Sequence, residues 1–183
     1  MPDLSYILEG IDPHVVDRAR KVKAVICDVD GVLTNGGIIY DDNGKEFKVF
    51  NVKDGQIISH LKRNGIAVGV ITGRESDVVK YRCNELKLDF HHHGIKDKLK
   101  TYRAILQNYG WEASETAYLG DDLIDIAVLR ECGLAITPAD APPYVQHFAH
   151  HVTRQNGGRG VLREAGDIIL TAQDKMKAII EEL

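Results

Sequence analysis

The sequence has few cysteines and no long apolar run. Its 183 residues include only three cysteines, Cys27, Cys83 and Cys132, which are scattered and form no C-x-x-C pair. This pattern does not indicate a disulfide framework or a zinc site built on cysteines. No run approaches the ~20 apolar residues of a membrane span, and residues 1–21 lack the apolar core of a signal peptide. We therefore expect a cytoplasmic protein with no membrane partner.

Positive charge is also scarce. The chain has 23 lysines and arginines against 27 aspartates and glutamates, for a formal net charge of -4. A nucleic-acid-binding surface needs a basic stripe, so we do not expect a nucleic-acid partner. A local basic pocket for a small anion is still compatible with this balance. The hydrophobic fraction of 44% is ordinary for a globular domain of this length.

Short apolar runs alternate with helical patterns after a leader of residues 1–21, which contains a short helix after Pro13. The expected strands are Val22–Cys27, Ile66–Ile71, Leu88–His92, Thr116–Leu119 and Gly133–Ile136. The expected helices are Gly55–Arg63, Ser76–Leu86, Lys98–Tyr109 and Leu123–Glu131. This alternation predicts an α/β fold in residues 22–183, with a doubly wound parallel sheet covered on both faces. Ligands bind such sheets beyond the carboxyl ends of the strands.

Residues 36–50 interrupt the alternation. Ile38–Tyr40 and Glu46–Phe50 flank an Asn-Gly pair at 43–44, which is a strong hairpin signal. A lone hairpin is marginal in water, so its apolar side chains must pack on something. They could fold onto their own domain, but exposed apolar patches usually mark interfaces, and we favour packing on a neighbouring subunit.

Two acidic segments follow expected strands. Asp28 and Asp30 end the first strand, where two carboxylates this close need a cation or a division into nucleophile and acid. Taken alone, Asp30-Gly31 would indicate only an Asx turn. Asp121, Asp122 and Asp125 follow a later strand and suit a hard cation such as magnesium. Helix capping would explain Asp122 or Asp125 but not Asp121.

A hydroxyl and a lysine complete the set. Thr72-Gly73-Arg74 follows the second strand, where the Thr72 hydroxyl could hold a phosphoryl oxygen or cap the next helix. Arg74 is either an anion ligand or a surface cation. Lys98 stands near an expected helix start, where positive charge is unfavourable to the helix dipole. It is either a surface lysine or the partner of an anion.

Together these segments resemble the four motifs of the haloacid dehalogenase (HAD) phosphatase superfamily, from about Val22 to the C-terminus. The matching segments are DVDGVLT, ITGR, Lys98 and GDDLID. The resemblance implies that Asp28 is the nucleophile and that Asp30 is the acid and then the base. It also implies that Thr72 and Lys98 hold the phosphoryl oxygens.

The same resemblance implies a magnesium cofactor. Its ligands would be the Asp28 carboxylate, the Asp30 backbone carbonyl and Asp121, with support from Asp122 and Asp125. The gaps between the motifs leave no room for the separate cap domain that many HAD enzymes insert.

Among members without a cap, the chain resembles 3-deoxy-D-manno-octulosonate 8-phosphate phosphatases. The hairpin, ITGR, GDDLID and the GGRG…RE of residues 157–164 carry this resemblance. It implies a homotetramer acting in lipopolysaccharide synthesis, with hairpins assembling centrally. It also places Gly73, Arg74, Arg159 and Arg163 around a sugar-acid phosphate. The glycines beside Arg159 suggest a mobile loop, although they also fit a helix-start turn.

Several alternatives stay open at this point. The substrate could be a nine-carbon keto-deoxy sugar acid phosphate, for which a Glu in place of Arg74 would be expected, or another sugar phosphate. Non-enzyme alternatives are a receiver-like signalling domain and a degenerate assembly domain. His91-His92-His93 has no assigned role. Consecutive strand residues alternate faces, so the three cannot converge on one metal, although His93 could touch substrate. His147 and His151 are weak evidence for zinc.

Overall fold

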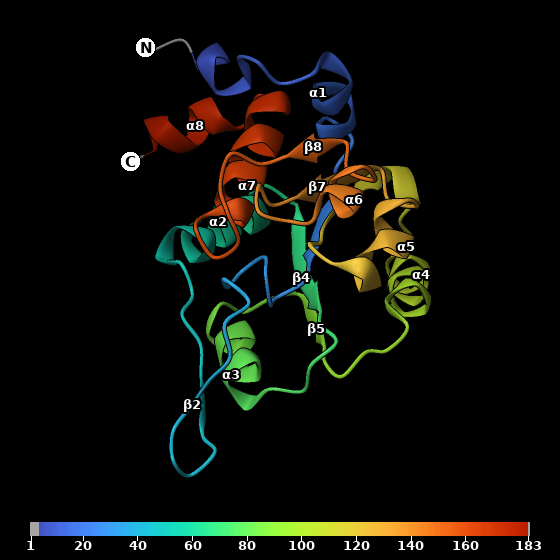
Figure 1. The fold of residues 1–183 in the computed structure, drawn as a ribbon. Coiled ribbons are helices and arrows are strands. Elements are labelled where there is room, and N and C mark those ends of the chain that lie inside the picture. Colours follow the sequence, from blue (N-terminus) through green and yellow to red (C-terminus); the bar gives the residue numbers. More distant parts are fainter. Residues whose placement is uncertain (1–3, 183) are drawn as a thin grey trace.

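The main sheet has six parallel strands in the order β5-β4-β1-β6-β7-β8 (Figure 1). It is seen in a computed structural model that describes residues 4–182. The strands are β1 Ala24–Cys27, β4 Ala67–Ile71, β5 Phe90–His92, β6 Thr116–Leu119, β7 Leu134–Thr137 and β8 His151–Val152. All five expected strands are present, most of them starting one or two residues later than expected, and β8 adds an edge that the sequence analysis missed.

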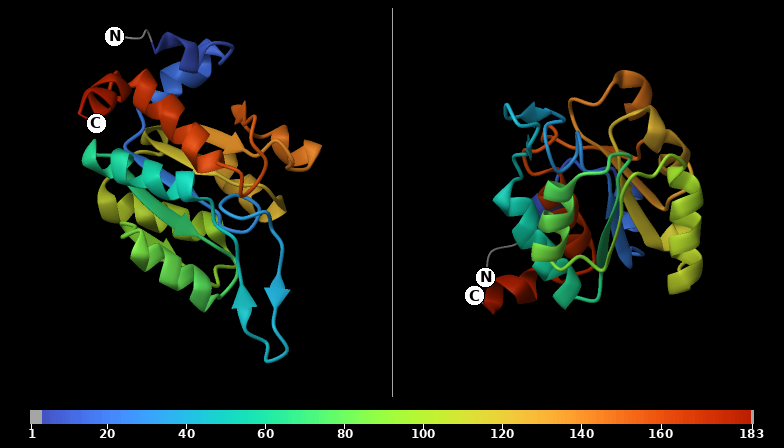
Figure 2. Two further views of the ribbon diagram at one scale, coloured as in Figure 1. Left: turned by 90° about the vertical axis from the view of Figure 1, so that its left-hand side faces the viewer. Right: turned by 90° about the horizontal axis from the view of Figure 1, so that it is seen from below.

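Helices cover both faces of this sheet (Figure 2). One face carries α1 Pro13–Ala19, α2 Val52–Arg63, α3 Asp77–Glu85 and α7 Val161–Ala172. The other carries α4 Lys98–Tyr109, α5 Ile126–Leu129 and α6 Pro143–Gln146. Side chains alternate along each strand, so Val25 and Cys27 enter the first core and Ile26 enters the second. The doubly wound α/β fold is therefore confirmed.

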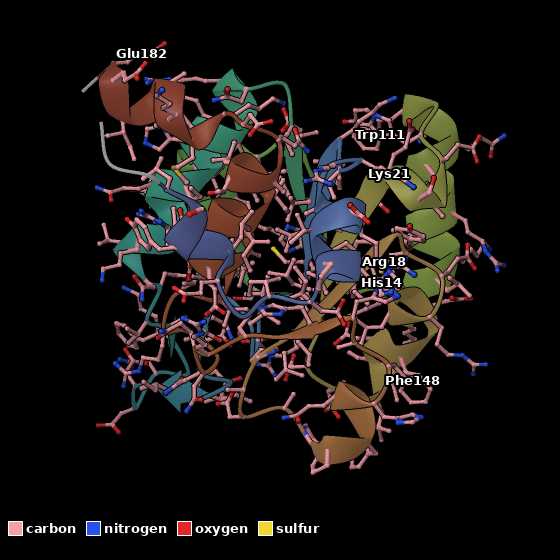
Figure 3. All side chains as sticks on the ribbon, turned by 90° about the horizontal axis from the view of Figure 1, so that it is seen from above. His14, Arg18, Lys21, Trp111, Phe148 and Glu182 are labelled. Atoms are coloured by element: carbon pink, nitrogen blue, oxygen red, sulfur yellow. The ribbon has the colours of Figure 1, made fainter. Side chains whose placement is uncertain are left out.

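The N-terminal segment packs on the body of the molecule. It contains a 3-10 turn, Ser5–Leu8, and α1, and both lie against α7. Arg18 of α1, labelled in Figure 3, donates to the carbonyl of Gly133 at 2.6 Å. Residues 1–3 of the expected leader and residue 183 lie outside the described residues, and the division at residue 21 stays a prediction. The last helix, α8 Met176–Glu181, follows α7.

The hairpin forms a separate two-stranded sheet, β2 Ile39–Tyr40 and β3 Glu46–Phe47. It projects beyond the carboxyl edge of the main sheet (Figure 2). Its apolar side chains do not fold onto their own domain, because Ile38, Ile39, Tyr40, Phe47 and Val49 are 45–72% exposed. The second strand is shorter than expected, because Phe50 turns inward and packs against the core beside α3.

The connections leave no space for a cap domain, as expected. Only the hairpin and α2 lie between β1 and β4, and only α3 and β5 lie between β4 and Lys98. Among residues 4–182, no helix combines the length and the apolar composition needed to cross a membrane.

Candidate active site

Asp28 lies at the carboxyl end of β1, the point where the strand order changes direction. Its backbone N–H continues the ladder to Leu119 at 2.9 Å, and its side chain is buried. One carboxylate oxygen accepts from the Val29 N–H at 2.7 Å, and the other lies 2.7 Å from the Lys98 Nζ. In open α/β sheets this switch point is where ligands bind.

Lys98 is buried and joins two motifs. Its Nζ lies 2.7 Å from Asp28 and donates to Asp125 at 2.7 Å, so the surface alternative for this lysine is wrong. Burial alone would lower the pKa of Lys98, but Asp28 and Asp125 raise it overall, which keeps the ammonium charged.

Asp125 organises the site rather than facing it. One of its oxygens also accepts from the Tyr118 hydroxyl at 2.7 Å, and the other accepts the backbone N–H groups of Asp121 and Asp122 at 3.1 and 3.2 Å. The sequence analysis missed Tyr118, because its hydroxyl meets Asp125 only once the strand and the following turn are folded.

Asp121 packs directly on the turn after Asp30. A Cβ on Gly31 would lie 2.0 Å from Asp121 Oδ2, and Gly31 has φ +89°. Glycine is therefore required both for the backbone conformation and for the close approach of the two acidic segments. Carboxylate oxygens of Asp121 and Asp28 lie within 4.8 Å of each other, which agrees with the proximity that the resemblance implies.

The hairpin supplies further charges to the site. Asp30 accepts from Lys48, whose side chain is fully buried, and lies 3.7 Å from Arg74 Nε. Arg74 also binds Glu46 at 3.0 Å and the Tyr40 hydroxyl at 3.1 Å. Lys48 was missed by the sequence analysis. Because side chains alternate along a strand, the pattern EFKVF places Lys48 on the other face of the hairpin from Phe47. This alternation is the one sequence signal that could have identified Lys48.

The carboxylates fit a divalent cation. Asp28, Asp121 and Asp125 each have an oxygen within 4.8 Å of the others. Burial raises the pKa of Asp28 to about 6 and that of Asp121 to about 8. Neighbouring carboxylates raise both values further, and Lys98 lowers them only in part. Asp121 Oδ1 and Asp30 Oδ2 are buried and have no hydrogen-bond partner in the described chain. Oxygen-only ligands of this kind suit magnesium.

Thr72 and Gly73 lie at the neighbouring strand end. Thr72 is buried, and its Oγ1 accepts from the Arg74 N–H at 3.4 Å. The cap of α3 is Ser76, so the capping alternative for Thr72 is wrong. A Cβ on Gly73 would lie 3.4 Å from Ile124, so the segment after β4 approaches the segment after β6.

Asp122 has a local role in the structure. It is exposed, and its carboxylate caps the turn at Leu123–Asp125 by accepting from the Leu123 N–H at 2.7 Å. The capping explanation therefore accounts for Asp122.

The GGRG segment lies against the Asp28 loop. The Gly158 N–H donates to Val32 at 2.9 Å, and a Cβ on Gly157 would lie 2.1 Å from the Gly31 carbonyl oxygen. Gly160 forms the N-cap of α7, so the helix-start alternative is correct and close packing explains the neighbouring glycines.

Arg159 and Arg163 are not brought to the carboxylates within this chain. Arg159 is exposed and Arg163 pairs with Asp167 at 2.8 Å. Both line a hollow of about 350 Å³ that also contains Lys53 and Arg154.

Comparison with known proteins agrees with this geometry. A family model described as haloacid dehalogenase-like hydrolase matches residues 88–164. The 3-deoxy-D-manno-octulosonate 8-phosphate phosphatase KdsC of Yersinia pestis is 43% identical over 163 residues, covering 89% of this chain and 87% of that protein.

Two solved structures are similar throughout. A crystal structure of the Yersinia pestis phosphatase has a TM-score of 0.89 at 42% identity and covers 90% of this chain and 89% of its own. The Moraxella catarrhalis phosphatase, in complex with a magnesium ion, a phosphate ion and a KDO molecule, has a TM-score of 0.90 at 36% identity. That match covers 92% of this chain and 97% of the other. The chain therefore belongs to the 3-deoxy-D-manno-octulosonate 8-phosphate phosphatase family of haloacid dehalogenase-like hydrolases.

Proposed function

We propose that residues 22–183 form a magnesium-dependent phosphatase domain that hydrolyses 3-deoxy-D-manno-octulosonate 8-phosphate to the free sugar acid and phosphate. The observation that carries the proposal is the buried Asp28 carboxylate, fixed by Lys98 and Val29 at the sheet's switch point. Family membership supports the same activity and leaves no support for the receiver-like and assembly-domain alternatives.

In the first step, a carboxylate oxygen of Asp28 attacks phosphorus, and the bond from phosphorus to the sugar oxygen breaks. Asp30 gives its proton to that leaving oxygen. The product on the protein is an aspartyl-phosphate. Thr72 and Lys98 bind the non-bridging oxygens, where charge builds up in the transition state.

In the second step, water attacks phosphorus and its proton passes to Asp30. The bond between phosphorus and Asp28 breaks, which releases phosphate and restores both carboxyl groups. Lys48 and Thr34 bind the same oxygen of Asp30, Thr34 at 3.4 Å. These contacts orient Asp30 as a proton carrier for both steps.

Magnesium would be held by the Asp28 carboxylate, the Asp30 carbonyl and Asp121. Asp125 would support the site by accepting the backbone N–H groups of Asp121 and Asp122. Asp122 would support it by capping the turn that follows. The bound ion supplies positive charge that offsets the charge of the phosphoryl oxygens.

Substrate selection is assigned to Gly73, Arg74, Arg159 and Arg163. A bidentate arginine–carboxylate contact is selective, which suits a substrate with a carboxylate as well as a phosphate. Arg74 is the member already beside Asp30, at 3.7 Å. Arg163 lies in the first turn of α7 and Arg159 directly precedes this helix, so we assign both to the substrate site of a neighbouring subunit.

The proposed assembly is a cytoplasmic homotetramer formed through residues 36–50, acting in lipopolysaccharide synthesis. The exposed apolar face of the hairpin supports this assembly, because such patches mark interfaces. Ile38→Glu and Phe47→Glu should dissociate it, with Asp42→Asn at the hairpin tip as a control. Light scattering that finds the wild-type chain monomeric at micromolar concentration would reject the tetramer.

The function is tested by measuring phosphate release with magnesium from the eight-carbon and nine-carbon sugar acid phosphates and from an aryl phosphate. We expect the highest kcat/KM for the eight-carbon substrate. A preference for the nine-carbon substrate would assign the chain to a nine-carbon sugar acid phosphatase. Equal rates on all three substrates would reject a sugar acid as the specific substrate.

A further inference from the structure

Cys83, His91 and His93 form a cluster of metal-binding side chains apart from the carboxylate site. Each offers one ligand atom, and the three atoms lie within 4.8 Å of one another. His91 and His93 are two residues apart at the edge strand β5 and share one face, while Cys83 comes from α3. His92 points to the opposite face, where its ring lies 6.2 Å from that of Phe90.

The two imidazoles already face each other. His91 Nδ1 lies 2.8 Å from His93 Nε2, and the rings meet edge to face with centroids 5.0 Å apart. In a tetrahedral zinc site with Zn–N of about 2.0–2.1 Å, two ligand nitrogens lie roughly 3.3 Å apart. The two nitrogens would have to separate by only about 0.5 Å to share a metal ion, and the Cys83 Sγ lies within 4.8 Å of both.

A neighbouring amide prepares His91 for this role. His91 Nε2 lies 3.2 Å from Asn84 Oδ1, and an amide oxygen only accepts, so the Nε2 atom carries the proton. The Nδ1 atom then presents its lone pair toward His93. Hydrogen bonding of the outer nitrogen is the usual support of a metal-bound histidine. The Nε2–H of His93 then donates to His91, and His93 Nδ1 is buried without a hydrogen-bond partner among the described residues.

We propose that Cys83, His91 and His93 bind a transition-metal ion of the zinc type, with a fourth position open to water. One thiolate and two imidazoles suit zinc or cobalt, whereas the oxygen ligands around Asp28 suit magnesium. Ion binding releases the thiol proton to solvent, and the His93 proton moves from Nε2 to Nδ1 so that Nε2 can bind the ion. The bound ion ties β5 to α3, and the half-buried histidines give it access. This inference does not depend on the proposed phosphatase function.

The test is a cobalt titration of the dialysed, reduced full chain in excess magnesium, followed by the thiolate-to-cobalt charge-transfer band. Cobalt at the carboxylate site has oxygen ligands and gives no such band. We expect one equivalent of cobalt to produce the band and one equivalent of zinc to remove it. The band should be absent in Cys83→Ala and His91→Ala, and unchanged in the matched control His92→Ala.

Loss of the band in the other variants could also result from misfolding. Asn84→Ala is a variant that we expect to stay folded, because Asn84 is exposed. Removing this supporting contact should weaken cobalt binding by roughly 10–100-fold without removing the band. The proposal is overturned if the wild-type chain gives no thiolate band, or if the band survives in His91→Ala, which retains all three cysteines. An unchanged affinity in Asn84→Ala would contradict the assigned role of its amide.

Discussion

Replacing Asp54 with asparagine should change how the stability of the fold depends on pH. Asp54 lies on α2, buried, and accepts the backbone N–H of Arg163 at 2.8 Å, in the first turn of α7. The N-cap residue of α7 is Gly160, which has no side chain to accept the free backbone N–H groups of the first helical turn. Asp54 thus caps a helix that is distant in sequence, and it holds α7 and the GGRG segment against α2.

Burial raises the pKa of Asp54 from 3.8 to about 6, despite the contacts to Arg163 and Leu162 that favour the ionised form. This difference corresponds to about 3 kcal/mol. Between about pH 4 and pH 6, the Asp54 carboxyl is protonated in the folded state and ionised in the unfolded state. Ionisation of Asp54 therefore lowers the free energy of unfolding as pH rises from about 4 to 6, and the loss is complete above that range.

The assay is urea unfolding of the magnesium-free protein at fixed protein concentration from about pH 4 to 7. Relative to wild type, Asp54→Asn should gain about 3 kcal/mol across this range, as an upper bound, because it cannot ionise. Asp54→Ala should show the same gain but lie roughly 1–3 kcal/mol lower throughout, because it leaves the α7 N–H groups unpaired. Parallel curves for wild type and Asp54→Asn would refute the reasoning.

Three further predictions concern the catalytic site. Activity should vanish with a chelator and return with magnesium but not with calcium, which prefers more ligands and looser geometry; turnover by chelated enzyme would contradict the metal site. Gly31→Ala should reduce kcat at least about tenfold by displacing Asp121, whereas Gly44→Ala, which shares a positive φ but meets no atom within 4 Å, should cost only backbone strain of roughly 1–2 kcal/mol. Equal activity of the two variants would argue against the Gly31–Asp121 contact. Arg74→Ala should lower kcat/KM on the sugar acid phosphate by an amount equivalent to roughly 1.5–3 kcal/mol, mainly by raising KM. The loss on an aryl phosphate should be much smaller. Equal losses on both substrates would mean that Arg74 serves the phosphoryl group or the fold.

The strands and the clustering of the acidic segments could be predicted from the sequence because both depend on local pattern. Runs such as Thr116–Leu119 are apolar and bounded by turn residues, and parallel strands bring their carboxyl ends to one edge. Asp28, Lys98 and Asp121 lie together for that reason.

The remaining features depend on contacts between distant residues. The glycines of residues 157–160 fit a helix start, but the carboxylate that caps α7 is Asp54, more than a hundred residues earlier, and no local pattern links the two. The edge strand β8 has only two residues and too little pattern to detect. Lys48 reaches Asp30 only because the chain returns to the main sheet after the second strand of the hairpin, and no periodicity predicts that contact.

The central claim is that Asp28 is the nucleophile, and the most direct test is phosphate release by Asp28→Asn. Asparagine keeps the volume and the contact with Val29 but removes the nucleophilic oxygen and a metal charge. We predict no phosphate release from 3-deoxy-D-manno-octulosonate 8-phosphate with magnesium, with the circular dichroism and urea midpoint of a folded protein. Release at the wild-type rate by this folded variant would contradict the account.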